Sequence, residues 1–257
     1  MTDIVADYHT HTRYSHGKGT IEENVQAAIK KGLECIGITD HGLGHVAFGL
    51  RPWEIRRARD ECVRIARKVA SKIEVLFGVE ANLISIDGDI DIIDQTRGMF
   101  DIVLLGFHSF AWISPGSLAH FYWRARRKGD RPSVLEAIKV TTDAYIKAIK
   151  KHKIDILTHL NDPIPVDVRR VARAAAEYGT AIEINNRHKS ISREELIAAM
   201  EEGADFVVSS DAHKPEDIGR FEAALELIKE CALPPGRIVN ARGSGISLKS
   251  LRREAGE

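Results

Sequence analysis

The feature that most constrains the fold of this chain is a regular alternation of short apolar segments with longer amphipathic segments. The apolar segments have the length and composition of buried β-strands, and the segments between them have the periodicity of α-helices. Parallel strands buried on both faces are typically near-continuous in apolar residues and connected by helices. Strands are predicted at residues 4–11, 34–41, 73–80, 101–108, 154–159, 180–186 and 205–213, and a shorter apolar segment follows at residues 237–240.

Several of the intervening segments carry helix end signals. In the first, Thr20 occupies an N-cap position, Glu23 completes a capping box and Gly32 follows the last turn. Helices are predicted at residues 20–31, 52–72, 134–151, 166–178, 194–202 and 216–230. The alternation continues along the chain without a linker-like interruption, so we predict one α/β domain over residues 1–257.

Polar side chains stand at the carboxyl end of strand after strand. In a barrel of parallel strands these ends meet at one face, where barrel enzymes build their active sites, whereas an open sheet would spread them along a line. We therefore expect a closed or nearly closed barrel of seven or eight strands. The polar residues at these ends are His9, His11, His16, Asp40, His41, Glu80, His108, His159, Asp211 and His213.

Histidine is concentrated at this predicted face. Seven of the eleven histidines lie at strand ends or in the turns that follow them. His9 and His11 are two residues apart, so on a strand both side chains point to the same face. Imidazole and carboxylate groups are suitable ligands for zinc, manganese or iron. Helix N-caps could explain Asp40 and Asp211 but not the whole set, and we therefore predict a metal site.

The composition narrows the possible partners. Basic and acidic residues balance at 37 each, so no overall field draws the chain to nucleic acid or to a membrane surface. The cysteines Cys35, Cys62 and Cys231 are scattered and odd in number, which favours a reducing compartment over a disulfide framework. We find no signal-like amino-terminal segment and no apolar run of about 20 residues. These features predict a soluble, cytoplasmic protein.

Six short motifs at the strand ends can be compared with known families. They are His9-x-His11-x4-His16, Thr39-Asp40-His41, Gly78-Val79-Glu80, Gly106-Phe107-His108-Ser109, Thr158-His159 and Ser210-Asp211-Ala212-His213. Together they resemble the motifs of the polymerase and histidinol phosphatase (PHP) family, from the first predicted strand to the seventh. The resemblance implies a distorted (β/α)7 TIM-like barrel with a trinuclear metal centre at its carboxyl-terminal face.

The resemblance also implies up to three divalent ions (zinc, manganese or iron) and a ligand set for each. The first ion is assigned to His9, His11, Glu80 and Asp211, the second to Glu80, His108 and His159, and the third to His16, His41 and His213. Every one of these positions carries a residue that can ligate a metal. Glu80 and Asp211 are the predicted catalytic residues, because each anchors metals that would activate the nucleophile.

The charge of such a centre indicates its chemistry. Two carboxylates and seven neutral imidazoles carry a negative charge, which three divalent ions would reverse to about +4. A centre of this charge attracts a dianionic phosphate and lowers the pKa of bound water toward neutrality. A hydroxide between two metals would then be the nucleophile for in-line attack on phosphorus.

We therefore predict a hydrolase of phosphoester bonds, most simply a phosphomonoesterase that resembles histidinol phosphatase and acts on a small molecule. A phosphodiesterase or exonuclease that acts on nucleotides or short nucleic acid is the alternative, and a non-catalytic, metal-stabilised binding module is a third. An amidohydrolase with a bridging lysine is disfavoured, because none of the predicted strand ends offers a lysine. The oligomeric state stays open.

Residues outside the ligand set have two possible roles each. Arg187 follows the sixth predicted strand and is either a ligand of the substrate phosphate or part of a solvated loop. Asp40 orients a neighbouring ligand or caps a helix. Glu183 either faces the barrel interior and supports a metal ligand or has a structural hydrogen-bonding role, which is favoured. Lys214 is assigned to a helix-entry turn, with a phosphate contact as the alternative. The remaining histidines, not predicted as ligands, include His45, His120 and His152.

The segment of residues 109–131 follows the predicted ligand His108. It combines aromatic and basic side chains, which suit stacked rings and phosphates. One interpretation is a lid that selects the leaving group, with Arg124 and Arg127 in contact with the substrate. The other is an extra helix anchored by its aromatic residues, with a solvated basic face. The residues are Phe110, Trp112, Phe121, Tyr122 and Trp123, with Arg124, Arg126, Arg127, Lys128 and Arg131.

Overall fold

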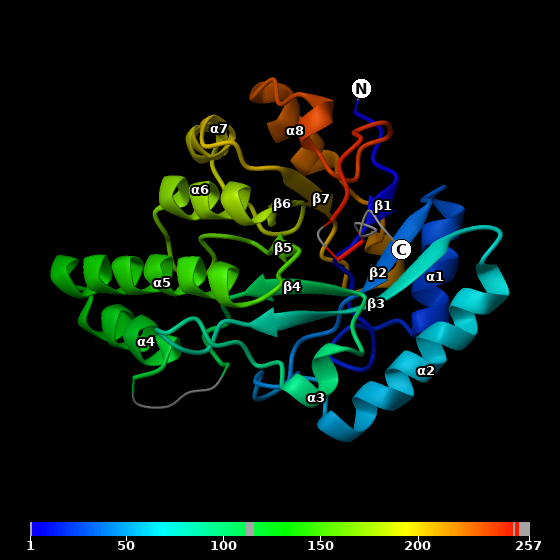
Figure 1. Ribbon diagram of the computed structural model, residues 1–257, viewed down its shortest axis with the longest axis horizontal. Helices are drawn as coiled ribbons and strands as arrows, with labels where there is room; N and C mark the ends of the chain where they lie inside the picture. The colour runs from blue at the N-terminus through cyan, green and yellow to red at the C-terminus, as the bar shows by residue number, and fades with distance from the viewer. Residues whose placement is uncertain (1, 112–115, 249, 252–257) are drawn as a thin grey trace.

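The computed structural model describes residues 2–111, 116–248 and 250–251. Its frame is a sheet of seven parallel strands that pair in chain order, with helices on the outside (Figure 1). The strands are β1 (Ala6–Asp7), β2 (Cys35–Ile38), β3 (Glu74–Asn82), β4 (Ile102–Gly106), β5 (Ile156–Leu157), β6 (Ala181–Asn185) and β7 (Phe206–Ser209). The predicted α/β barrel of (β/α)7 type is confirmed.

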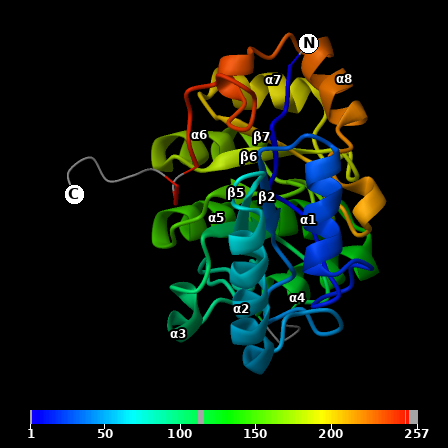
Figure 2. The same cartoon turned by 90° about the vertical axis from the view of Figure 1, so that its right-hand side faces the viewer.

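The helices cover the outer face of this sheet, with α1 and α2 on one side and α4 and α5 on the opposite side (Figures 1 and 2). They are α1 (Ile21–Lys30), α2 (Pro52–Val69), α3 (Asp94–Arg97), α4 (Leu118–Lys128), α5 (Arg131–Lys151), α6 (Val168–Tyr178), α7 (Arg193–Glu201) and α8 (Glu222–Glu230), with 3₁₀ turns at Pro215–Asp217 and Pro235–Arg237. Within the described ranges, none of the helices has the length and apolarity that crossing a bilayer requires.

Several predicted boundaries were wrong, including that of the first strand, which ends at Asp7 rather than at residue 11. Three further differences have identifiable reasons. The last strand ends at Ser209 rather than at residue 213, because Asp211 has a positive φ of 53° that breaks the extended chain. The last helix begins at Glu222 rather than at residue 216, since Gly219 follows the 3₁₀ turn with a φ of 71°. The helix α5 begins three residues early, because Asp130 rather than a later residue caps it.

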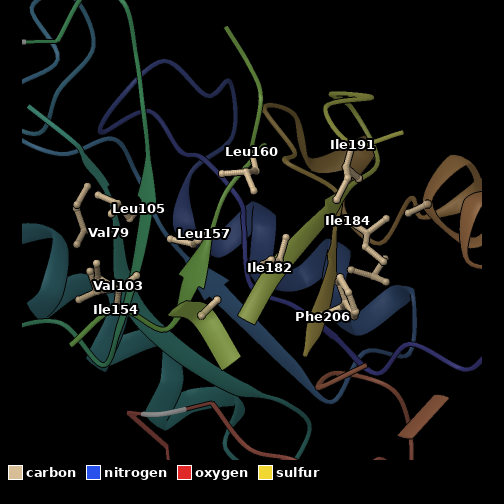
Figure 3. Packing of buried hydrophobic residues seen from close by; sticks show 14 of the residues in the cluster. Val79, Val103, Leu105, Ile154, Leu157, Leu160, Ile182, Ile184, Ile191 and Phe206 are labelled. Atoms are coloured by element: carbon tan, nitrogen blue, oxygen red, sulfur yellow. The ribbon is translucent and has the colours of Figure 1, made fainter. Parts of the chain in front are cut away.

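The strands separate two hydrophobic layers. On β4, Ile102 and Leu104 belong to the cluster inside the barrel, whereas Val103 and Leu105 belong to the larger cluster under the helices. Figure 3 shows this outer layer, in which side chains of neighbouring strands pack together. Because successive side chains alternate between the two faces, every second residue of each strand lines the barrel interior.

The strands β1 and β7 do not pair with each other, and the seam between them is bridged by an isolated bridge of Thr10 with Ala212 and by side chains such as Asn240. The Asn240 amide donates to the carbonyl oxygens of Ala6 and Val208, at 2.7 Å each, and its own oxygen accepts from Val208 N. Ile238 pairs with Phe206 only as an isolated bridge, so the apolar segment 237–240 does not form an eighth strand. The barrel is therefore nearly closed.

The carboxyl-terminal segment covers the amino-terminal end of the barrel. Leu248 is buried in the inner cluster. The carboxylate of Asp155, which is fully buried just before β5, accepts hydrogen bonds from Val103 N, Ser250 N and Ser250 Oγ at 2.9, 2.6 and 2.8 Å. The opposite end of the barrel is left for the polar strand ends.

Candidate metal centre and active site

The middle of the predicted metal site is built on β3. The inward-facing row of this strand begins with Leu76 in the inner cluster, and the two-residue period of a strand brings Glu80 and Asn82 to the same side. Glu80 is completely buried. The row is therefore apolar near the amino end of the strand and polar where the strand reaches the carboxyl-terminal face.

Glu80 is surrounded by imidazole rings. Five predicted ligands bring a ring nitrogen within 3.7 Å of one of its carboxylate oxygens. The distances are 2.7 Å for His41 Nδ1, 2.8 Å for His159 Nε2, 3.5 Å for His9 Nε2 and His108 Nε2, and 3.7 Å for His11 Nε2. These side chains follow four different strands, β1, β2, β4 and β5, and the barrel brings them together around one carboxylate.

Asp211 is the second carboxylate of the cluster and lies just after β7. Its φ of 53°, like the 26° of His159, lies in the left-handed region, which few residues other than glycine adopt and which recurs at functional sites. The resulting turn places Asp211 Oδ1 3.4 Å from His11 Nε2 and from His213 Nδ1, and 3.7 Å from His9 Nε2.

His16 completes the predicted set from the loop after β1. Its ring centroid lies 4.1 Å from that of His213 and 4.8 Å from that of His41, on which it stacks. The His11 ring lies 5.7 Å away. All nine predicted ligands therefore converge on one end of the barrel.

The donor set fits metal ions better than it fits a hydrogen-bond network. His41 Nδ1 and Glu80 Oε2 are 2.7 Å apart, yet both count among the buried polar atoms without a hydrogen-bond partner, because their mutual orientation is wrong for one. His9 Nε2 and His11 Nε2 face each other at 3.1 Å. Two donors that share one zinc ion at ordinary bond lengths lie about 3.3 Å apart, a spacing that these pairs approach.

Groups of three side chains could each hold an ion. Among the described residues, three such groups have all their ligand atoms within 4.8 Å of one another. They are His9, His11 and Glu80; His41, Glu80 and His108; and His11, His41 and His213. The grouping differs from the implied assignment, because His41 also joins the group of Glu80, His11 also joins that of His213, and His16, His159 and Asp211 fall outside these groups. The groups share members, as expected of adjacent sites with bridging ligands.

Burial keeps several of these rings neutral. Burial lowers the pKa of His11 and of His108 well below the usual histidine range. The pKa of His16 falls to about 3, and that of His213 to about 4, again chiefly through burial. A neutral imidazole offers a lone pair, which is the form that a metal requires.

Glu183, inside the barrel on β6, holds two of the proposed ligands in place. Its carboxylate lies 2.7 Å from His9 Nδ1 and accepts from the backbone N–H of His159 at 2.8 Å. Asn185 Nδ2 donates to the same carboxylate. The structural hydrogen-bonding role favoured from sequence is thus real, but it also orients a ligand histidine, because His9 presents its other nitrogen to Glu80.

A second set of hydrogen bonds that supports a proposed ligand, His108, was not predicted from the sequence. Asn82 Oδ1 lies 2.7 Å from His108 Nδ1, and the carboxylate of the buried Asp91 accepts from both the backbone and the side-chain N–H groups of Asn82. Asp91 also accepts from Gly44 N at 2.6 Å. The available signal was the position of Asn82, two residues beyond Glu80 and therefore on the same inward row.

Asp40 neither caps a helix nor contacts the carboxylates of the cluster. It accepts from Thr12 N at 2.7 Å, from Thr12 Oγ1 at 2.6 Å and from Ser15 Oγ. The N-cap of the following helix α2 is Arg51. The helix-cap interpretation was wrong, and the contacts show that Asp40 shapes the loop that carries His16.

The ligands open onto a pocket of about 270 Å³. Several of its lining residues were not predicted as part of the site, among them His45, Phe48, Asp162 and His188. His45 stacks on His41 with ring centroids 4.9 Å apart, and Phe48 stacks on His16 at 4.6 Å. His188 lies between two carboxylates, with Nδ1 2.6 Å from Asp162 and Nε2 3.3 Å from Asp211. The complete lining is His16, His41, His45, Phe48, Glu80, Phe107, His108, Ser109, Phe110, His159, Asp162, Pro163, Arg187, His188, Asp211 and His213.

The other residues that the sequence set aside lie away from this pocket. His152 Nε2 lies 3.2 Å from the carbonyl oxygen of Gly88, and His120 packs edge-on against Phe121. Lys214 precedes the 3₁₀ turn Pro215–Asp217 rather than the helix α8, which begins at Glu222.

Arg187 reaches the ligand cluster from the loop after β6. Its side chain is half-exposed, and its Nη1 lies 2.6 Å from His213 Nδ1 and 3.6 Å from Asp211 Oδ1. A guanidinium at this edge of the pocket is placed to meet an anion that enters from solvent. The solvated-loop interpretation of Arg187 does not describe these contacts.

The segment after His108 contains the helix α4, which lies on the side to which the strands β3 and β4 point (Figure 1). Trp123 Nε1 donates to the carbonyl oxygen of Ser109 at 2.9 Å, and the Tyr122 ring packs edge-on against Phe107. The predicted aromatic Trp112 lies outside the described residues. The observed contacts are those of the helix-anchoring interpretation.

The basic residues of α4 do not line the pocket. Arg124 forms an ion pair of 2.9 Å with Glu136 on α5, and Arg127 is exposed. Among the described residues of the segment, only Ser109 and Phe110 contribute to the pocket wall. A substrate contact by Arg124 or Arg127 stays a prediction that these positions do not support.

Comparison with known proteins agrees with the geometry. The family model of the PHP domain matches residues 7–226. A probable phosphatase of Thermoanaerobacter sp. strain X514 is 35% identical and aligns over 98% of both chains. A probable phosphatase of Shewanella baltica strain OS195 is 34% identical over 93% of this chain and 88% of that protein.

Solved structures show the same fold. Histidinol phosphate phosphatase from Lactococcus lactis, solved with zinc, L-histidinol and phosphate, superposes with a TM-score of 0.59 at 20% identity, over 88% of this chain and 93% of that one. A putative histidinol phosphatase from Listeria monocytogenes also gives 0.59, at 16% identity, over 84% and 97%. With its ligand-type residues gathered at one barrel end, the chain belongs to the PHP family and, within it, to the phosphatases, which hydrolyse phosphoester bonds.

Proposed function

We propose that this protein is a metal-dependent phosphomonoesterase that acts on a small molecule. The observation that carries the proposal is the convergence of seven imidazoles and two carboxylates at one end of the barrel, where both carboxylates and five of the imidazoles line one pocket. Several of these side chains keep a buried polar atom without a hydrogen-bond partner. Up to three divalent ions (zinc, manganese or iron) would bind there. When bound, they would neutralise phosphate charge and lower the pKa of a water molecule toward neutrality.

The protein's own residues would hold the substrate and keep the ligands in place. Arg187 stands at the edge of the pocket, where its guanidinium would bind the phosphate oxygens that face away from the metals. Glu183 and Asn82 would fix the ring orientations of His9 and His108 during turnover. Glu80 and Asp211 would keep the site assembled by bringing their negative charge to the metals.

The size of the pocket favours a small substrate over a polymer. Its volume of about 270 Å³ is below the roughly 300–1,000 Å³ typical of pockets for drug-sized ligands. The balanced charge of the chain also offers no general attraction to a nucleic acid backbone. A phosphodiesterase or exonuclease activity is therefore the less favoured candidate.

The test combines metal removal with paired substrates. Protein freed of metal with a chelator and then reloaded with zinc, manganese or iron(II) is assayed on p-nitrophenyl phosphate and bis(p-nitrophenyl) phosphate. We expect no turnover without metal and a clear preference for the monoester after reloading. Preference for the diester would favour the phosphodiesterase, and full activity of metal-free protein would contradict the proposal.

We also propose a cytoplasmic location. All three cysteines are buried and free of disulfides, as expected in a reducing compartment. Fractionation of the native cells with an antibody against the protein would test this, and recovery in the extracellular medium would contradict it.

A further inference from the structure

The outer wall of the pocket differs from its floor. The floor consists of the imidazoles and carboxylates, whereas the two aromatic rings of Phe48 and Phe110 lie on the wall near its mouth. Phe48 is 44% exposed and Phe110 is 53% exposed. Large apolar side chains that remain exposed beside a binding site often mark a contact surface for a ligand.

Backbone contacts hold the loops that carry these rings. His45 and Ala111 form an antiparallel bridge, and Val46 N donates to the carbonyl oxygen of Phe110. The loop between β2 and α2 also has its own bonds, including Phe48 N to His45 Nδ1. The two rings are therefore placed by a paired structure rather than by two independent loops.

Each of the two phenylalanine rings also packs against another aromatic ring. Phe48 stacks on His16 with ring centroids 4.6 Å apart, and Phe110 packs against Trp123 at 5.4 Å. Trp123 is in turn fixed by its bond to the Ser109 carbonyl oxygen. Because the rings are already ordered, a ligand that covers them loses little conformational freedom of the protein on binding.

The remaining part of the wall is mixed, with Phe107 and Pro163 beside several polar residues. Asp162, Arg187 and His188 line the pocket together with the two rings. A substrate that enters with its phosphate toward the histidines would therefore have an apolar surface and a polar surface beside its leaving group. A ring next to the phosphate would cover Phe48 and Phe110, whereas a short polar chain would leave them exposed to water.

We propose that Phe48 and Phe110 form a binding site for an apolar, ring-bearing leaving group, so that the substrate class is a phosphomonoester of an alcohol with an aromatic ring close to the phosphate. This inference rests on the proposed phosphomonoesterase function. Stacking and burial of one ring against two aromatic side chains supports a preference of about tenfold or more over a substrate without the ring.

The test compares substrates that share the same kind of leaving group. Both 2-phenylethyl phosphate and ethyl phosphate release a primary alcohol, so the ring is the main difference between them. With the metal-loaded protein we expect kcat/KM to be at least about tenfold higher for the ring-bearing substrate. Phe110→Ala should lower this ratio about fivefold, and Phe110→Leu should lower it less, because leucine keeps part of the apolar surface.

Controls separate the ring site from the metal site. Leu135→Ala removes a side chain that is also 53% exposed but does not line the pocket, and it should leave the ratio unchanged. Phe48→Ala is read together with metal content, since Phe48 touches a proposed ligand. A wild-type ratio near one, or a ratio that neither phenylalanine variant changes, would overturn the inference.

Binding of non-hydrolysable analogues distinguishes the two proposals. Calorimetry with 2-phenylethylphosphonate and ethylphosphonate measures the ring preference without any turnover. If no phosphomonoester is hydrolysed but the ring-bearing phosphonate binds more tightly, the proposed function fails and the ring site stands. If both esters are hydrolysed equally and both phosphonates bind equally, the ring site fails and the proposed function stands.

Discussion

Both ends of the barrel contain buried carboxylates, but these carboxylates differ in their hydrogen-bond partners. At the amino-terminal end, the Asp155 carboxylate accepts three hydrogen bonds from Val103 and Ser250. At the carboxyl-terminal end, Glu80 Oε2 is buried without a hydrogen-bond partner and lies among imidazole nitrogens. The first arrangement satisfies its carboxylate with protein donors, whereas the second leaves one carboxylate oxygen without a hydrogen-bond partner, as expected at the proposed metal site.

The difference shows how to separate structural from metal-binding carboxylates in this fold. A buried charge without compensation is costly, so a structural carboxylate collects N–H and O–H donors. Asp7 follows this rule at the barrel seam, where it accepts from Ser210 N, Ser210 Oγ and Gly219 N. Glu80 Oε1 accepts from Thr158 Oγ1 and lies 2.8 Å from His159 Nε2, but its Oε2 has no such partner, which is the pattern expected of the proposed metal ligand.

The largest expected effect comes from removing the charge of Glu80 while keeping its shape. Glu80→Gln should lower kcat/KM for p-nitrophenyl phosphate on the order of a thousandfold, because the bridging carboxylate no longer holds the metals. Metal content, measured by elemental analysis, should fall in parallel while circular dichroism shows an intact fold. Full metal loading with wild-type turnover would remove Glu80 from the proposed site.

A smaller effect is expected at Gly106, which lets the ligands approach the strand β4. A Cβ at this position would lie 2.6 Å from Thr158 Oγ1, 3.0 Å from His159 Cε1 and 3.3 Å from Glu80 Oε1. Gly106→Ala should therefore displace the ligands and lower kcat/KM about 10- to 100-fold. Gly98→Ala is the matched control, because a Cβ there meets nothing within 4 Å. Equal rates for the two variants would contradict the crowding argument.

Substitutions at the amino-terminal end of the barrel should lower stability and leave activity unchanged. Asp155→Asn replaces one acceptor oxygen by a donor that faces other donors, so the free energy of unfolding should fall by about 1–3 kcal/mol in a urea titration. Metal content and kcat/KM should stay unchanged. Ser250→Ala removes one donor and should cost less, about 0.5–1.5 kcal/mol. If Asp155→Asn released metal, the contrast between the two ends would be lost.

The smallest effect is expected for the basic face of α4. Arg124 is paired with Glu136 at the surface, and Arg127 is exposed and outside the pocket lining. Replacing both by glutamine should change KM for p-nitrophenyl phosphate by less than about twofold, since partly exposed ion pairs contribute little. A marked rise in KM at low salt, with unchanged metal content, would restore the lid interpretation of this segment.

Sequence reasoning succeeded where a role depends on position along a strand. His9 and His11 are two residues apart, and Glu80 ends an apolar run, so their common orientation followed from the strand period. Sequence reasoning failed for pocket residues that lie in loops. His188, Asp162 and His45 reach the pocket from connections that carry no periodic pattern, and the backbone turn at Asp211 was predicted as strand.

The sequence by itself determined the barrel class and the residues that gather at the carboxyl ends of its strands, because apolar periodicity and strand-end position are local properties of the chain. Only the tertiary structure decided which polar atoms are satisfied. Asp40, Asp155 and Glu80 are all acidic residues next to or within predicted strands. The carboxylates of Asp40 and Asp155 accept hydrogen bonds from N–H and O–H donors of segments distant in sequence, whereas the carboxylate of Glu80 lies against imidazoles. The difference could not be predicted, because the fold decides which distant segments lie beside each side chain.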